Sequence, residues 1–241
     1  MTRAGARFSL LLEKARGAGD IARVTNRFKD KYLVRGAQCA VALVVVSCGG
    51  RKPQEPPVPA PTIPLPTAGL AGQKVSLFPL TLVAAEDTLH WEAFFVDRRG
   101  SLRTADSIIT DLLSSRAPEV NWMLPDELRR AARRSAGIAA DPDQLGTAVL
   151  RAEQLFDVPD PLRSQMRTLA ALSGGRYAVV PAALVYRRSA VPPFNPTAEL
   201  SIVLVDTRLA KIEWRTVARG EGADPWSALA RAVKALTPGL P

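Results

Sequence analysis

The chain has 241 residues and a formal net charge of +9, with 32 Lys and Arg against 23 Asp and Glu. Such a charge invites a nucleic-acid interpretation, but it is unevenly placed. Residues 1–47 hold nine of the basic residues and three of the acidic ones, which leaves 23 against 20 for the rest. The remaining excess, 23 minus 20, is too small to indicate a phosphate-binding partner, so we predict no nucleic-acid partner.

An uncharged apolar run, AQCAVALVVVSC, extends from Ala37 to Cys48. A positive segment, an apolar core of about a dozen residues and a small residue at the cut are typical of a secretory signal. The run is shorter than the roughly 20 apolar residues of a membrane-spanning helix. Residues 1–48 are therefore predicted to be a leader. The alternative is a buried strand, VALVVV, but a proline-rich sequence follows at once and gives such a strand no pairing partner.

The end of this run resembles the lipobox of bacterial lipoprotein signal peptides, which has an aliphatic residue, a tolerant position, a small residue and a cysteine. These positions are Val45, Val46, Ser47 and Cys48. The resemblance implies cleavage between Ser47 and Cys48, diacylglycerol on the Cys48 sulfur and a membrane partner through this anchor. Cys39 would leave with the leader, so the folded part would hold no disulfide and no cysteine-ligated metal.

The predicted leader is longer than an ordinary signal peptide, because residues 1–36 precede the apolar run. Our hypothesis is that translation starts near Val34, which gives a signal of normal proportions. The intact mass of precursor trapped before cleavage tests this, and a precursor that begins at Met1 would refute it.

Residues 49–72 contain seven prolines and are predicted to be a disordered, semi-rigid tether. At about 3.1 Å per residue such a tether reaches roughly 70 Å. The alternative is a ligand for a proline-recognising domain.

Residues 73–241 are predicted to form a single domain. Asp-Pro pairs at 141–142, 160–161 and 224–225 are typical helix starts, and Gly174 is a typical helix end. Asp106 is expected in a first helical turn, where a carboxylate offsets the helix dipole. Pro79 and Pro181 indicate a bulge or break in their strands.

In chain order, the apolar patterns predict a series of strands and helices. They are a strand at 74–83, a loop or short hairpin around His90, a helix at 104–116, a strand at 119–124, a helix at 125–137, helices after Asp141 and Asp160, a strand at 176–187, a hairpin at 198–222 and a helix after Asp224. This order predicts an α/β layered sandwich with parallel first strands, a C-terminal antiparallel hairpin covered on one face, and flanking helices.

The order of elements, with phrases such as LVDTRLAKIEW at 204–214, resembles the envelope α/β domain shared by the TolB amino-terminal domain, LpoB and CsgG. The resemblance covers most of residues 74–236. It departs from that group in a long insert around His90 and in lacking the amphipathic segments with which CsgG forms a pore. It implies a fold more than a function.

The residues that enzymes use are scarce in this sequence, which predicts a non-enzymatic protein without cofactor or metal. His90 is the only histidine, and no serine stands in a G-x-S-x-G turn. Gly174 and Gly175 match no nucleotide-binding fingerprint. The acids at 141–143 and 157–160 fit helix capping better than a calcium site.

Four arginines in PDELRRAARR, at 125–134, form the candidate binding site, namely Arg129, Arg130, Arg133 and Arg134. Their spacing places them along one stripe of a helix, where forked donors suit an acidic partner such as phospholipid headgroups, a phosphorylated polymer or protein carboxylates. The alternative is an ordinary solvated face, with Asp126 and Glu127 near the positive helix end.

These features together predict a lipid-anchored cell-envelope lipoprotein that is anchored in the outer membrane and faces the periplasm. Gly49 follows the cysteine in place of the aspartate associated with inner-membrane retention. Its α/β domain is expected to bind another envelope protein or assembly, as a regulator or accessory subunit. The alternatives are an oligomerising component of a secretion or transport apparatus and, third, a hydrolase that depends on His90.

Overall fold

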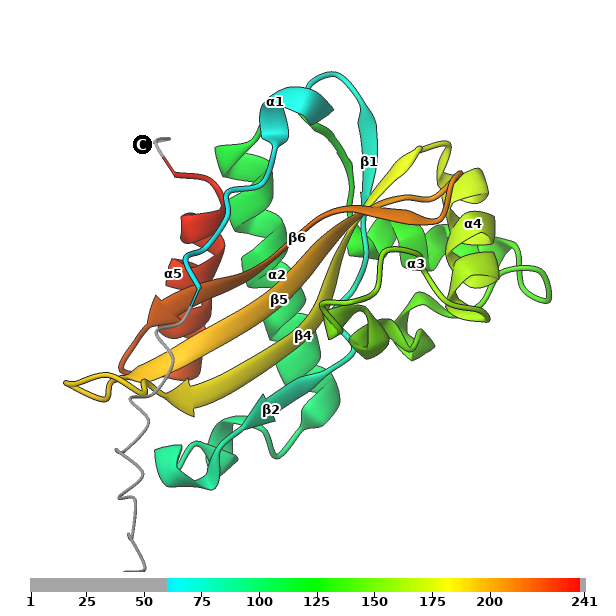
Figure 1. Ribbon diagram of the computed structural model, residues 1–241. Coiled ribbons are helices and arrows are strands. Elements are labelled where there is room, and N and C mark those ends of the chain that lie inside the picture. Colours follow the sequence, from blue (N-terminus) through cyan, green and yellow to red (C-terminus); the bar gives the residue numbers. More distant parts are fainter. Residues whose placement is uncertain (1–59, 239–241) are drawn as a thin grey trace, which may run out of the picture. The chain divides into compact units, whose positions relative to one another are not determined.

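The computed structural model describes residues 60–238, so Ser47, Cys48, Val34 and the predicted leader lie outside the described part. Here six strands form one sheet in the order β3-β1-β4-β5-β6, with β2 also paired to β4 (Figure 1). The strands are β1 (Lys74–Leu77), β2 (Val83–Ala85), β3 (Asn121–Met123), β4 (Tyr177–Arg188), β5 (Pro196–Asp206) and β6 (Lys211–Glu221). The helices are α1 (Thr67–Leu70), α2 (Arg98–Arg116), α3 (Pro125–Arg134), α4 (Leu162–Ser173) and α5 (Pro225–Leu236).

The sheet is mixed, as predicted. β1 pairs in parallel with β3 and β4, and β2 pairs in parallel with β4. β4, β5 and β6 are antiparallel neighbours. The β4–β5 register shifts between Pro181 and Ala183, which confirms the predicted irregularity, because proline has no N–H for a ladder hydrogen bond. The predicted fold class, an α/β sandwich with a mixed sheet, is confirmed.

The predicted first strand is divided into two. β1 ends at Leu77, two residues before Pro79, and the chain pairs with β4 again at Val83–Ala85. β1 lies against residues 177–179 of β4 and β2 against residues 184–186, so both occupy the same edge of β4 in succession. The break therefore replaces one long strand by two short ones that pair with the same edge of β4.

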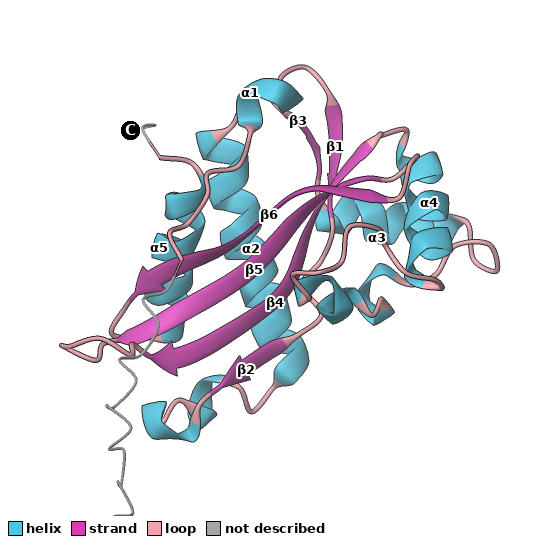
Figure 2. Ribbon diagram, in the orientation of Figure 1, coloured by secondary structure: helices cyan, strands magenta, loops and turns pink. Residues whose placement is uncertain are grey.

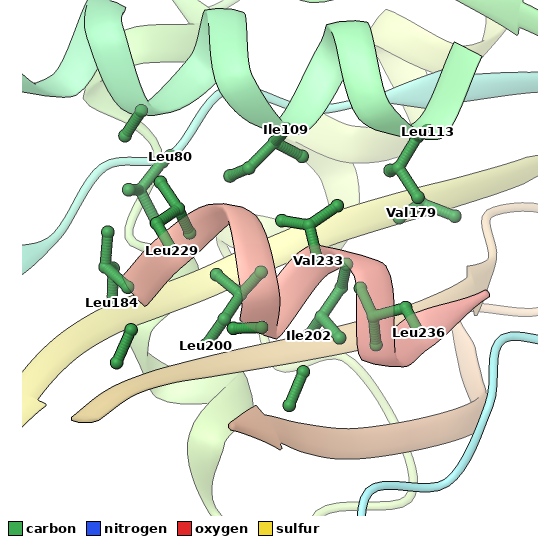
Figure 3. Packing of buried hydrophobic residues seen from close by; sticks show 14 of the residues in the cluster. Leu80, Ile109, Leu113, Val179, Leu184, Leu200, Ile202, Leu229, Val233 and Leu236 are labelled. Carbon is green, nitrogen blue, oxygen red and sulfur yellow. The ribbon is translucent and has the colours of Figure 1, made fainter. Parts of the chain in front are cut away.

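Helices cover both faces of the sheet (Figure 2). On one face α2 and α5 pack against β4 and β5 through a cluster that includes Ile109, Leu113, Leu200, Ile202 and Val233 (Figure 3). On the other face α3 and α4 pack against the same strands through Leu128, Met166, Leu169, Val203 and Val205. The expectation that the hairpin is covered on one face is wrong, because Val203 and Val205 are buried beneath this second layer.

Three predicted helix starts need correction. α2 begins at Arg98 and not at Thr104, which places Asp106 in the helix interior. The helix expected after Asp141 is replaced by two 3-10 helices, η3 (Pro142–Gln144) and η4 (Thr147–Arg151), separated by Leu145 and Gly146. Before α4 the cap position is Pro161, with no side-chain cap bond, so Asp160 is not the cap.

The other helix ends agree with the sequence. The Asp224 carboxylate accepts hydrogen bonds from the N–H groups of Trp226 and Ser227, both at 3.0 Å, so the predicted cap of α5 is confirmed. Asp141 caps η3 by accepting from Asp143 N at 3.1 Å. Gly174 ends α4 at φ 72°, a left-handed conformation that glycine adopts without strain.

The predicted tether is too long at its carboxyl end, because residues 60–72 lie against the domain. Ile63 N donates to Thr216 Oγ1 at 2.8 Å, and Arg219 N donates to Thr62 Oγ1 at 3.3 Å, so residues 62–63 lie along the outer edge of β6. Leu65 and Leu70 are buried in the α2–α5 core. The apolar residues between the prolines therefore supply core contacts, and only residues 49–59 remain for a tether.

The insert around His90 contains two 3-10 helices, η1 (Asp87–Leu89) and η2 (Glu92–Phe94), in place of a simple loop or hairpin. Its aromatic residues pack on the core as expected: Trp91 lies edge-on to Tyr186, with ring centroids 5.4 Å apart. Phe95 contacts both Tyr186 and Trp226. His90 is exposed.

Candidate functional site

The four predicted site arginines do not share one environment. α3 buries Leu128, Ala131 and Ala132 toward the sheet, so the residues opposite them face solvent. Arg130, Arg133 and Arg134 are exposed there, as the stripe predicts. Arg129 instead lies at the edge of this face and its side chain is 14% exposed. The exposed stripe therefore consists of three arginines.

Arg129 is surrounded by three carboxylates from three segments. Its Nη2 donates to Asp106 Oδ2 of α2 at 2.5 Å and to Asp143 Oδ1 of η3 at 2.7 Å. Its Nε also donates to both oxygens of Asp143, at 2.9 and 3.0 Å, and its Nη1 donates to Asp126 Oδ1 at 2.9 Å. This cluster joins α2, α3 and η3.

Asp106 is the buried member of the cluster, with a side chain that is 6% exposed. The predicted role of Asp106 in a first helical turn is wrong, since it lies well inside α2 and its Oδ1 accepts from Leu80 N at 2.8 Å. Asp106 therefore joins the loop after β1 to Arg129.

Burial raises the pKa of Asp106 from 3.8 to about 6, although the hydrogen bonds from Leu80 and Arg129 lower it. For Arg129, burial lowers the pKa, but the hydrogen bonds to Asp143 and Asp106 outweigh burial and hold the pKa above its usual value. Arg129 divides its donors among three carboxylates. Its interaction with Asp106 therefore lowers the pKa of that carboxyl group by less than burial raises it.

Two hollows of about 680 Å³ each meet at this cluster, and Arg103 and Arg129 line both of them. The first lies between α2 and η3 and includes Arg98 and Arg99, and the second lies between α2 and α3 and includes Arg130 and Arg133. Our sequence reasoning missed Arg98, Arg99 and Arg103. The available signal was the spacing of Arg99 and Arg103, one helical turn apart.

Acids line the same groove. The first hollow also contains Asp141 and Asp143, and the second contains Asp106, Asp111, Asp126 and Glu127. Several of these acids already have partners, since Glu127 Oε2 accepts from Leu124 N at 3.2 Å and Asp111 Oδ2 accepts from Ser107 at 3.3 Å. The groove is therefore suited to ionic contacts, with cations available mainly on α2 and on the outer side of α3.

The other candidate chemistry is not assembled within residues 60–238. His90 follows η1 in a left-handed conformation, φ 54°, and makes no side-chain hydrogen bond to the residues described. In the same part of the chain, no three His, Cys, Asp or Glu residues are grouped as metal ligands. No helix in residues 60–238 is long and apolar enough to cross a bilayer. Ser47 and Cys48 are outside this range.

No protein-family model matches the chain, and no curated protein matches it. The chain is similar to several solved structures. The LpoB C-terminal domain from Salmonella enterica is 13% identical with a TM-score of 0.38, over 63% of this chain and 84% of that one. The PelC dodecamer from Paraburkholderia phytofirmans is 12% identical with a TM-score of 0.33, over 74% and 94%.

Lipoprotein GNA1162 from Neisseria meningitidis is 12% identical with a TM-score of 0.31, over 62% of this chain and 81% of that one. At these identities and TM-scores the likenesses carry no argument about function or assembly. The functional conclusions below rest on the residues of this chain.

Proposed function

We propose that this chain is a lipid-anchored cell-envelope lipoprotein whose α/β domain binds another envelope protein or assembly as a regulator or accessory subunit. The observation that carries the proposal is Cys48, which follows Val45-Val46-Ser47 at the end of an apolar run. An acylated Cys48 would hold the domain at a membrane surface, with outer-membrane anchoring facing the periplasm as the proposed location.

The contacts of residues 60–66 shorten the proposed tether. Gly49 to Pro59 remain between Cys48 and the described domain. Extended at about 3.1 Å per residue, they span about 34 Å, roughly half the reach expected from the sequence. The proposed partner therefore lies close to the anchoring membrane.

The test of the anchor is the mature amino terminus and its mass. The full chain, expressed in a Gram-negative bacterium and extracted in detergent, should begin at Cys48 and carry the added mass of a diacylglycerol. It should also fractionate with membranes. Cys48→Ser should be unacylated and should leave the membrane fraction. A wild-type product that retains residues 1–47, or one that is water-soluble with a free thiol, would refute the anchor.

The exposed stripe of α3 is the proposed contact with anionic groups of the partner or of lipid headgroups. Replacing Arg129 together with the stripe would confuse binding with folding, because Arg129 holds three segments together. The informative variant replaces Arg130, Arg133 and Arg134 with Gln and keeps Arg129. Made in the Cys48→Ser chain, so that no acyl anchor holds the protein on the membrane, it should fold normally and lose binding to anionic phosphatidylglycerol vesicles or envelope fractions. Undiminished binding by the folded variant would refute the role of the stripe.

The alternative function is an oligomerising component of a secretion or transport apparatus. The molecular mass of the protein in solution distinguishes it from the function proposed above. Light scattering on the detergent-extracted chain should give a monomer under the proposal. A stable ring would support the alternative.

A further inference from the structure

Two strand edges of the sheet have no pairing partner within residues 60–238, the outer side of β3 and the outer side of β2, and only the β2 edge adjoins a hollow lined by aromatic and acidic residues. β1 and β2 follow each other along the same edge of β4, and β3 pairs with the outer side of β1. No strand within the described range pairs with the outer side of β2. Figure 2 shows β2 at the border of the sheet, well separated from β3. The outer edge of β2 is therefore open to another chain.

The backbone of β2 presents hydrogen-bonding groups on this outer side. Leu184 N donates to Leu82 O and Glu86 N donates to Tyr186 O, so residues 82, 84 and 86 direct their backbone groups toward β4. Because strand residues alternate, the N–H and C=O groups of Val83 and Ala85 point away from β4. Within residues 60–238, no other segment makes a hydrogen bond to the backbone N–H or C=O groups of Val83 and Ala85.

A hollow of about 300 Å³ lies beside this edge, lined by residues 83–87 of β2 and its continuation and by Trp91, Glu92 and Phe95. Trp91 and Phe95 are fixed from behind by Tyr186, with ring centroids 5.4 and 5.6 Å away. Aromatic rings held in this way give an apolar side chain of an incoming strand a rigid contact surface. The edge thus combines backbone donors and acceptors with a side-chain pocket.

The charge of the hollow is of one sign. Glu86, Asp87 and Glu92 line it, and no Lys or Arg does. Arg188 directs its guanidinium to Thr88 O at 3.0 Å, while its backbone N–H donates to Glu86 Oε2 at 3.2 Å. Basic side chains at alternate positions of an added strand would find carboxylates there.

We propose that the β2 edge binds an extended segment of a partner protein by strand addition, and that this segment alternates basic and apolar residues. Backbone hydrogen bonds to Val83 and Ala85 set its register, and an apolar side chain enters the hollow beside Trp91 and Phe95. The flexible basic side chains on either side of it reach around the strand to Glu86, Asp87 and Glu92, whose carboxylates are exposed at the rim of the hollow. Strand addition of this kind takes its affinity from the backbone and its specificity from the pockets. The proposal names the kind of partner for the function proposed above but does not depend on acylation.

The experiment uses the full chain in detergent and two capped peptides, KVKVKVK and EVEVEVE, with binding followed by tryptophan fluorescence. The basic peptide should bind saturably with a Kd below about 1 mM, and at least tenfold more tightly than the acidic one. The Cys48→Ser chain should bind it equally well, so failure of the anchor and failure of this site give different results.

Variants at Ala85 separate strand addition from simple charge attraction. Ala85→Pro removes an N–H that points away from β4 and so keeps the β2–β4 ladder. It should weaken binding of the basic peptide about tenfold, whereas Ala85→Val keeps the N–H and should weaken binding clearly less than Ala85→Pro does. Should Ala85→Pro fail to fold, the exposed pair Asp87→Lys and Glu92→Lys provides the test, because it should reverse the preference between the two peptides.

Three results of the peptide experiments would overturn the proposal. They are equal binding of the two peptides, equal affinities of a folded Ala85→Pro and of Ala85→Val, and an unchanged preference in the Asp87→Lys, Glu92→Lys chain. Concentration-dependent dimerisation that Ala85→Pro abolishes would also overturn it, since the edge would then belong to a second copy of this chain.

Discussion

Replacing Arg129 with Gln isolates the contribution of the buried cluster to stability. Asp106 would lose its cation while remaining 6% exposed. Removing one partner of a buried ion pair commonly costs about 3–5 kcal/mol, because the other charge stays buried and unpaired. Here the cost should be smaller, since Asp106 can take up a proton.

The pKa of Asp106 determines how far protonation reduces the stability loss caused by Arg129→Gln. Its rise from 3.8 to about 6 means that the carboxylate already costs about 3 kcal/mol at pH 7, at about 1.4 kcal/mol per pKa unit. Without Arg129 the pKa rises further, but protonation limits the total cost at pH 7 to about 4.4 kcal/mol. The additional loss at Asp106 is thus at most about 1.4 kcal/mol. Losing the more exposed contacts to Asp143 and Asp126 adds about 1 kcal/mol, so we expect about 2–2.5 kcal/mol in all.

The pH dependence has a definite sign. A carboxyl group whose pKa is higher in the folded than in the unfolded protein stabilises the folded state most below its unfolded pKa. This stabilisation is lost as the pH rises through the folded pKa. Asp106 should therefore favour folding below about pH 4 and lose this contribution as the pH passes about 6. The Arg129→Gln penalty should in turn be smaller at pH 5 than at pH 7, because Asp106 is then largely protonated in both proteins.

Urea unfolding followed by tryptophan fluorescence at pH 5 and pH 7 measures these differences. Arg130→Gln is the matched control, since Arg130 is exposed on the same helix and should change the free energy of unfolding by less than about 0.5 kcal/mol. The reasoning fails if the two variants are equally stable at pH 7, or if the Arg129→Gln penalty is as large at pH 5.

Three further changes test the packing by urea unfolding. Gly220→Ala should destabilise by about 3 kcal/mol, because its Cβ would meet the backbone of α5 at Ala232, whereas Gly69→Ala has open space and should be close to neutral; equal effects would contradict this. Asp224→Ala should cost about 1 kcal/mol through loss of the α5 cap, and Asp224→Asn, which keeps an acceptor, should cost less. Leu200→Ala should cost about 2–5 kcal/mol and Leu200→Met less than about 1.5, and a small loss in both would argue against the α2–α5 core.

The elements with strong local signals were predictable from sequence. α5 has an Asp-Pro start and an apolar stripe, and β5 and β6 alternate side chains toward the two faces. α2 shows the limit. Its first turns, RRGSLR at 98–103, contain little apolar periodicity because most of their residues face the groove and solvent, so the pattern indicates a start near Thr104. This start places Asp106 in the first turn, so the sequence pattern does not reveal that Asp106 is buried and bonded to Arg129.

The site was less predictable than the fold, and Arg129 shows why. A helical projection places the four arginines of α3 on one polar arc, and nothing in PDELRRAARR distinguishes Arg129 from its neighbours. The difference comes from Asp106 and Asp143, which lie 23 and 14 residues away in sequence and approach only when α2 and η3 pack beside α3. Local patterns identify a polar face, whereas tertiary contacts decide which of its charges remain free.

The β6 and β2 borders of the sheet differ in whether another segment covers them. At β6, residues 62–63 bond to one half of the outer edge, and Phe156 O accepts from Ile212 N on the other half. Covering a strand edge in this way prevents unwanted pairing, and a proline-rich segment suits the task because it offers few N–H groups of its own.

β2 has no such cover among residues 60–238, although a strand edge is costly to leave open. Its shortness and its three adjacent carboxylates limit non-specific pairing, because an apolar strand would desolvate these charges without pairing them, whereas a basic strand would pair with them. β4 and β5 separate β2 from β6, so the segment that lies along β6 leaves the β2 edge accessible. An edge that is short, acidic and backed by fixed aromatic rings is selective for one class of partner strand, which is why we assign partner binding to β2 and not to β6.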